Sequence, residues 1–172
     1  MSHSDHTHNS GACQGKAENL HSILDTTDAR LNRILRKRDL APNIRLLEVF
    51  CPAIARSCKP GQFLVVRQDD RAERVPLTIA DFDRDKGTIT MVVQVIGVAS
   101  QRLDALQAGD RVRDIVGPLG HASEIEKFGT VICIGGGLGI APVFPIQRAL
   151  KEAGNTVIGI AGARNAEMMF WD

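Results

Sequence analysis

The order of segments near the C-terminal end constrains the fold most strongly. Thr130–Ile134 is a continuous apolar run, and Thr156–Ala161 is a second. Between them lie a glycine-rich turn, Gly135–Pro142, and a predicted helix, Pro142–Ala153, which ends at Gly154. Continuous apolar strands are typical of a parallel sheet that is buried on both faces. A helix between two parallel strands is the usual crossover, so this segment predicts a strand–helix–strand unit of an α/β sheet.

The glycine-rich turn is a candidate phosphate site. Glycine lets backbone amides approach a ligand where a β-carbon would clash, and a helix N-terminus adds N–H donors and partial positive charge. Pro142 suits the first turn of the helix, where no amide donor is missed. The spacing departs from G-x-G-x-x-G, and no acidic residue ends the second strand, which disfavours a Rossmann dehydrogenase. A tight turn without a ligand is the structural alternative. The candidate residues are Gly135, Gly136, Gly137, Leu138, Gly139, Ile140, Ala141 and Pro142.

The preceding region has a different pattern. Short β-rich runs alternate with turns that contain Gly, Pro and Asp, which predicts a compact antiparallel barrel or sandwich. One interruption, Ala99–Leu106, is predicted to be helical. The predicted strands are Ile44–Cys51, Gln62–Gln68, Pro76–Phe82, Thr88–Ile96 and Asp110–Val116.

Two sheet types in one chain predict two domains. We expect the barrel at residues 30–124 and the α/β unit at 125–172, with a boundary near Ile125–Gly129. Residues 1–29 form a polar extension that we expect to be disordered, with a short helix possible over Leu20–Leu35. The tail also carries three histidines that could capture a metal, although a flexible segment offers no preorganised site. They are His3, His6 and His8.

The composition excludes several classes of function. The 21 Lys and Arg residues are balanced by 20 Asp and Glu, so no basic surface for nucleic acid is expected. No apolar run reaches the about 20 residues that a membrane-spanning helix needs. The cysteines form no C-x-x-C pair, which disfavours a zinc or iron–sulfur site, and without a signal peptide they are typical of reduced thiols in the cytoplasm. These are Cys13, Cys51, Cys58 and Cys133.

Two further stretches carry polar groups that could hold a phosphate. In Arg74–Thr78, strand alternation places Arg74, Pro76 and Thr78 on one face and Val75 and Leu77 on the other. The guanidinium could bind a phosphate bidentately, although a surface arginine on an edge strand is equally compatible with the pattern.

The second stretch, Val95–Ser100, lies at a strand-to-helix junction. Gly97 permits close approach of a ligand, and Ser100 could donate to a phosphate. Ser100 as a plain helix cap is an equally good interpretation. Gly117–Gly120 predicts a stiff turn that connects the barrel to the second domain.

Several motifs in this order resemble the ferredoxin–NADP reductase superfamily. They include Lys59–Phe63, Pro76–Asp81, Gly117–Gly120, Glu126–Thr130 and Gly162–Asn165. The resemblance runs almost without gaps from about Arg33 to Arg164. In particular, the chain resembles the alpha subunits of NADH-dependent reduced ferredoxin:NADP oxidoreductases, with the electron-transfer subunits of dihydroorotate dehydrogenases as near relatives. This resemblance implies an all-β antiparallel Greek-key FAD-binding barrel, followed by the first β-α-β of a parallel α/β nucleotide-binding domain.

The resemblance also implies roles for individual residues. Arg74 would contact the FAD pyrophosphate, Pro76 and Leu77 would lie along the flavin, and Thr78 would face its reactive N5 edge as the catalytic residue. Arg164 would contact the phosphate or ribose of the nicotinamide nucleotide, which the turn Gly135–Pro142 would receive. The remaining implied FAD contacts are the backbone of Gln94, Val95 and Ile96, for the flavin or ribityl chain, and Gly97, Val98, Ala99 and Ser100, for the phosphates. The absence of Tyr excludes a Tyr-stacked flavin.

The implied activity is hydride exchange between NAD(P)H and the flavin, followed by one-electron steps to an iron–sulfur partner. That partner would be an iron–sulfur flavoprotein large subunit or a ferredoxin in a hetero-oligomer. The family continues beyond Asp172 with cysteines for a [2Fe–2S] cluster, and these ligands are absent from this sequence. We therefore expect a truncated product or an assembly with another chain. The alternative function is a catalytically silent FAD-binding or regulatory scaffold.

Overall fold

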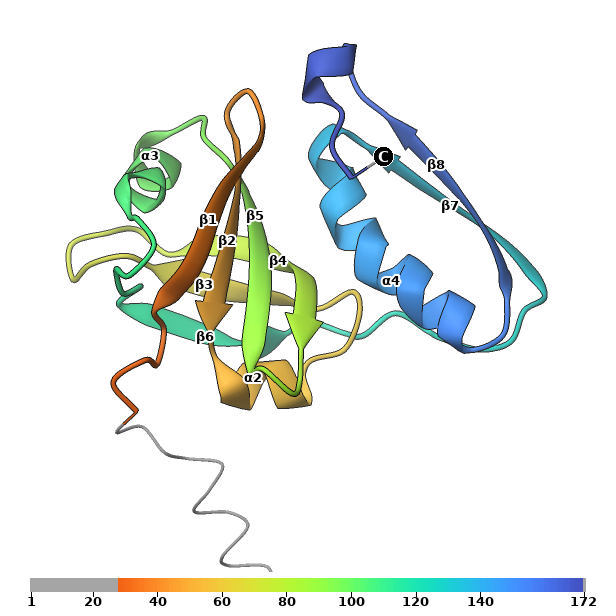
Figure 1. The fold of residues 1–172 in the computed structure, drawn as a ribbon, viewed down its shortest axis with the longest axis horizontal. Helices are drawn as coiled ribbons and strands as arrows, with labels where there is room; N and C mark the ends of the chain where they lie inside the picture. The colour runs from red at the N-terminus through yellow and green to blue at the C-terminus, as the bar shows by residue number, and fades with distance from the viewer. Residues whose placement is uncertain (1–27, 172) are drawn as a thin grey trace, which may run out of the picture.

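The first part of the molecule is an antiparallel β-barrel (Figure 1). The computed structural model describes residues 28–171. Six strands pair in the order β1-β2-β5-β4-β3-β6. The start of β1 and the segment before β6 close the barrel through Ile34 N–H to Asp110 O (2.8 Å) and Val112 N–H to Asn32 O (2.9 Å). The strands are β1 (Ile34–Ala41), β2 (Ile44–Phe50), β3 (Phe63–Arg67), β4 (Val75–Asp83), β5 (Thr88–Gln94) and β6 (Asp114–Leu119).

Alternating aliphatic residues fill the barrel. On β2 and β5 every second side chain points inward, so Leu47 and Val49 meet Ile89 and Met91 in one buried cluster. Two short helices, α2 (Pro52–Ser57) and α3 (Val98–Ala105), pack on the barrel. Each contributes to the same core, α2 through Ile54 and α3 through Leu103. The predicted antiparallel barrel is therefore confirmed.

The second part is the predicted strand–helix–strand unit. Strands β7 (Thr130–Gly136) and β8 (Thr156–Gly162) pair in parallel, with Val131 opposite Val157. The turn between them forms a short 3-10 helix, η1 (Gly137–Gly139), and continues into α4 (Ile140–Glu152). A second 3-10 helix, η2 (Ala166–Met168), follows β8. Helix α4 begins two residues before the predicted start, which leaves Pro142 in its first turn as expected.

Helix α4 lies between the two-stranded sheet and the barrel (Figure 1). Its first residues, Ile140 and Ala141, pack against Ala80 of β4 and Ile44 of β2, and Phe170 completes this buried cluster. A continuous apolar interface therefore joins α4 to the outer face of the barrel. Within residues 28–171, no helix is long and apolar enough to cross a bilayer.

Several sequence predictions were wrong in detail. Strand β1 was not predicted, and it replaces the C-terminal end of the helix expected over Leu20–Leu35. The strand expected at Asp110–Val116 instead begins at Asp114 and continues through Gly117 and Pro118, which were expected to form a turn. Proline is tolerated there because β6 is an edge strand. The predicted histidine site and residues 1–27 of the N-terminal extension lie outside the described residues.

Candidate functional site

The N-terminal half of β4 presents its candidate residues on two faces, as strand alternation predicts. Val75 and Leu77 pack against the barrel core, whereas Arg74 and Pro76 are exposed and Thr78 is half-buried on the outer face. The structure therefore separates Leu77 from the other three candidates of this segment, Arg74, Pro76 and Thr78. Among residues 28–171, Arg74 takes part in no ion pair, so its guanidinium is available for an anionic group.

The start of α3 forms an open cradle. Gly97 precedes the helix in an extended conformation (φ −143°), and a β-carbon placed on it would meet no atom within 4 Å. The amides of Val98, Ala99 and Ser100 belong to the first helical turn, where no carbonyl four residues earlier in the helix can accept them. A helix start with free amides and an open approach suits a phosphate.

Ser100 acts as a cap in this structure. Its Oγ accepts hydrogen bonds from the amides of Ile96 and Gly97 (both 3.0 Å) and donates to the carbonyl of Gly97 (2.9 Å). The amide of Val95 donates to Asn43 O (2.8 Å). Because the amides of Val95, Ile96 and Gly97 already have acceptors, they are not free donors for a ligand.

The glycines of the second turn have two separate functions. A β-carbon on Gly135 would lie 2.9 Å from Ile140 Cα, so Gly135 allows α4 to approach β7 closely. By contrast, a β-carbon on Gly136, Gly137 or Gly139 would meet nothing within 4 Å. Gly137 also has a positive φ of 50°, which favours glycine. The turn thus contains one packing glycine and three that leave its surface open.

The side chains of this turn are less accessible than its backbone. Ile140 and Ala141 are buried against the barrel, and Leu138 packs at the edge of the same cluster. Helix α4 has no side-chain cap at its N-terminus and no acidic residue in its first turn, so its partial positive charge is not neutralised locally. Beyond β8, Arg164 is exposed and forms no ion pair with any described residue.

A small cavity of about 210 Å³ opens between α4 and β8 beside the turn. Gly135, Ile140, Gln147 and Gly159 line it, and Trp171 lies at its edge with its ring 4.9 Å from that of Phe144. Ligand pockets for whole small molecules are usually about 300 Å³ or larger. The cavity can therefore receive only part of a dinucleotide.

The outer face of β4 leads to the start of α4. Thr78 and Ala80 share the outer face of β4, and Ala80 packs with Ile140 and Ala141 at the start of α4. One ion pair that the sequence did not reveal reinforces this arrangement: Arg148 Nη2 lies 2.6 Å from Asp81 Oδ1. The pair joins residues that are 67 positions apart, and no local motif signals it.

An antiparallel barrel with an open helix start, followed by a strand–glycine turn–helix, is the architecture of ferredoxin–NADP reductases. The family model for the oxidoreductase FAD-binding domain matches residues 32–123. This match covers more than half of the chain, and the chain therefore belongs to that family. The predicted resemblance is thus confirmed.

Similar proteins of known sequence extend the comparison. A Thermotoga maritima protein named as a homolog of the dihydroorotate dehydrogenase B (NAD(+)) electron transfer subunit is 42% identical over 139 residues, which are 81% of this chain and 49% of that protein. The Shouchella clausii electron transfer subunit of dihydroorotate dehydrogenase B is 30% identical over 145 residues, 81% of this chain and 56% of its own length. The chain thus spans about half the length of the curated relatives it matches.

Solved structures agree with this placement. A structure of the NADH-dependent reduced ferredoxin–NADP oxidoreductase, a flavin-based electron-bifurcating enzyme, superimposes with a TM-score of 0.80 at 41% identity and covers 83% of this chain and 51% of its own. Phthalate dioxygenase reductase matches with a TM-score of 0.69 at 20% identity over 81% of this chain and 45% of its own, which supports the fold alone.

Proposed function

We propose that this chain is an electron-transfer flavoprotein unit that binds FAD on the barrel, receives NAD(P)H at the turn before α4, and passes electrons to an iron–sulfur partner. The observation that carries the proposal is the open cradle at Gly97, within the part of the chain that the FAD-binding family model matches. A phosphate fits this cradle because free amides and an uncrowded approach coincide there.

Residues of two segments, Arg74–Thr78 and the cradle at Gly97, share the proposed binding of FAD. Arg74 supplies a positive charge for the pyrophosphate, and Val98, Ala99 and Ser100 supply backbone donors. Pro76 and Thr78, on the outer face of β4, are proposed to contact the flavin ring. FAD, when bound, supplies the hydride and electron chemistry, and the protein supplies position and electrostatics. Thr78 is the residue proposed to face the reactive edge.

The nicotinamide site and the partner follow from the second part of the chain. Gly136, Gly137 and Gly139 leave the backbone before α4 open to a pyrophosphate, and Arg164 is proposed to contact the phosphate or ribose. Several relatives are named as electron transfer subunits, which supports a hetero-oligomer with an iron–sulfur flavoprotein subunit or a ferredoxin. A [2Fe–2S] cluster would belong to that assembly, and we place the chain in the cytoplasm.

Reconstitution with FAD followed by reduction tests the proposal. The purified protein is titrated with FAD, and the complex is mixed anaerobically with NADH or NADPH in a stopped-flow instrument. We expect flavin absorbance to be retained after desalting and to bleach on mixing. A protein that retains no flavin refutes the FAD site.

A second candidate function is a catalytically silent FAD-binding scaffold. It is favoured by the sheet β7–β8, which has only two strands among the described residues and leaves Ile134 and Ile160 exposed on its outer face. Retained flavin that neither NADH nor NADPH bleaches would support this function over electron transfer.

A further inference from the structure

A group of three charged side chains fixes the C-terminal end of α3 to the barrel. Asp104 Oδ1 lies 3.0 Å from Lys37 Nζ on β1 and 3.1 Å from Arg45 Nε on β2. Lys37 also donates a hydrogen bond to the backbone carbonyl of Asp104. The side chains of Lys37, Asp104 and Arg45 are only 15%, 24% and 20% exposed, so water screens these ion pairs less than a typical surface pair.

The apolar contacts of α3 lie near its C-terminal end. Leu103 is the one buried residue of this eight-residue helix, and Leu106 at its C-cap packs against the same core. The ion pairs of Asp104, which lies between these two residues, add a polar constraint on the direction of the helix. Lys37 and Arg45 come from neighbouring strands and both pair with Asp104, and Arg45 Nε also pairs with Asp39 (3.0 Å). Ion pairs to two strands restrict the orientation of the helix axis.

The opposite end of α3 is the cradle at Gly97. Because a helix of this length is rigid, a rotation at Asp104 displaces the amides of Val98, Ala99 and Ser100 that face the phosphate. We infer that Asp104 is a positioning residue for the FAD pyrophosphate: its ion pairs with Lys37 and Arg45 hold the start of α3 in the orientation that binds the diphosphate. This inference rests on the proposed FAD site and adds to it a residue remote from the ligand.

The substitution Asp104→Asn tests the inference in the full chain. It keeps the shape of the side chain and removes the charge that pairs with Lys37. Dissociation constants are measured for FAD and for riboflavin, which has no phosphate, together with the melting temperature. We expect FAD affinity to fall roughly tenfold, the equivalent of one mispositioned hydrogen bond to a charged group, and riboflavin affinity to stay within about twofold by the same measure.

Glu48→Gln is the matched control. Glu48 also lies on β2 and pairs with a β1 residue, Arg36 (3.0 Å), but not with α3. We expect it to leave both affinities unchanged. Lys37→Met is the second variant, and it replaces Asp104→Asn if that protein fails to fold; it should reproduce the selective loss of FAD affinity.

A double-mutant cycle with Gly97→Ala adds an independent readout. If Asp104 acts through the cradle, Asp104→Asn has little further effect once Gly97→Ala has obstructed it. Equal losses for FAD and riboflavin, additive losses in the cycle, or no loss at all would overturn the inference. A wild-type protein that binds no FAD would instead refute the proposed function, so the two failures are distinguishable.

Discussion

Gly97, before α3, and Gly135, before α4, differ in the space around them. This difference gives a first prediction. A methyl group on Gly97 enters open space, whereas one on Gly135 meets Ile140 Cα at 2.9 Å. We expect Gly135→Ala to destabilise the fold by about 1–3 kcal/mol through overpacking. Gly97→Ala should leave stability unchanged and weaken FAD binding at least roughly tenfold, because the methyl group occupies the place of a phosphate.

Thermal unfolding and FAD titration of the two variants check this pair. Each variant serves as the control for the other, because both replace a glycine near the start of a helix by alanine. Loss of stability in Gly97→Ala without loss of FAD affinity would show that the cradle has a structural role only.

A second prediction concerns two buried thiols, those of Cys51 and Cys58. Cys51 and Cys58 flank α2 and are 4% and 0% exposed. Burial raises the pKa of each thiol from 9.0 to about 11. The unfolded chain therefore loses these protons first as pH rises, and stability that is fully present below pH 9 is lost between pH 9 and about 11. The loss is at most about 3 kcal/mol per thiol.

Denaturant unfolding across this pH range, compared with a Cys51→Ala/Cys58→Ala variant, isolates the contribution of the thiols. Other groups that titrate at high pH are common to both proteins, so they cancel in the difference. The wild-type protein should lose more stability than the variant between pH 9 and about 11. Parallel curves would mean that these thiols do not retain their protons in the folded state.

Between elements, one ion pair joins α4 to β4 beside their apolar interface. Arg148 lies 2.6 Å from Asp81 and 5.4 Å from the centroid of the Phe82 ring. Both charged side chains are about one-third exposed, so the pair contributes no more than about 1 kcal/mol to stability. Its larger effect is on geometry. The pair fixes α4, which follows the glycine turn, relative to β4, which carries Thr78 three residues before Asp81.

We therefore expect Arg148→Met to leave FAD affinity unchanged and to slow flavin reduction by NAD(P)H several-fold, since small misplacements of reacting groups are costly. Stopped-flow reduction measures this rate. Lys151→Met is the control, because Lys151 is on the same helix and forms no ion pair with a described residue. Equal rates in Arg148→Met and wild type would remove Arg148 from any positioning role.

Elements of the fold differ in how clearly the amino-acid sequence predicts them. Strands β7 and β8 were predictable because both are short apolar runs on either side of a glycine turn, and β4 was predictable because its residues alternate. Strand β1 was missed because Arg36–Asp39 are four consecutive charged residues, which are typical of a loop. Pairing with β2 and ion pairs such as Arg36–Glu48 stabilise it as a strand, and those interactions depend on the tertiary fold.

The sequence predicted the glycines of the candidate site but not its long-range ion pairs. Gly97 and the turn at Gly135 could be found from the local sequence, because glycine before a helix indicates a place where the backbone can be approached closely. The contacts of Asp104 with Lys37 and of Asp81 with Arg148 each span 67 positions. Only the closed barrel and the packed α4 bring these residues together, so no local pattern could reveal them.

At the scale of the whole molecule, the outer face of the β7–β8 sheet is apolar and exposed. Ile132 and Ile134 lie opposite Ile158 and Ile160 in the parallel pairing, and the four side chains are 47–68% exposed. Contiguous apolar surface of this kind is unusual on a soluble domain, whereas strands of a parallel sheet are normally covered on both faces. The face opposite α4 is thus uncovered among the described residues.

We expect this face to bind an apolar fluorescent dye and to lower the solubility of the protein. Lysine at Ile134 and Ile160 (Ile134→Lys/Ile160→Lys) should reduce dye fluorescence and raise solubility, because the charges point into solvent and interrupt the patch. FAD affinity should not change, since the face lies across the sheet from α4 and the barrel (Figure 1).

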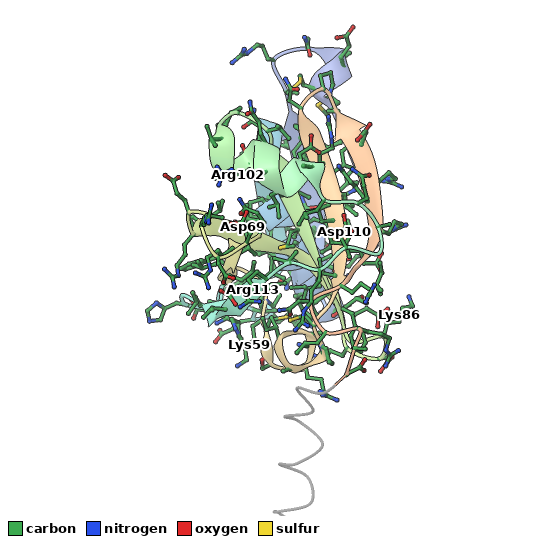
Figure 2. All side chains as sticks on the ribbon, turned by 90° about the vertical axis from the view of Figure 1, so that its left-hand side faces the viewer. Lys59, Asp69, Lys86, Arg102, Asp110 and Arg113 are labelled. Carbon is green, nitrogen blue, oxygen red and sulfur yellow. The ribbon has the colours of Figure 1, made fainter. Side chains whose placement is uncertain are left out.

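Leu35→Lys is the control, because Leu35 is a comparably exposed apolar residue (45%) on the barrel. Figure 2 views the molecule from the side where Arg102 and Arg113 are labelled. A single substitution at one exposed residue of the barrel should change dye binding little, because isolated apolar side chains on a surface form no patch. If dye fluorescence falls equally in the control and the double variant, the dye is reporting general exposure of apolar side chains. If it falls in the double variant alone, the uncovered sheet face is the principal apolar surface of this chain.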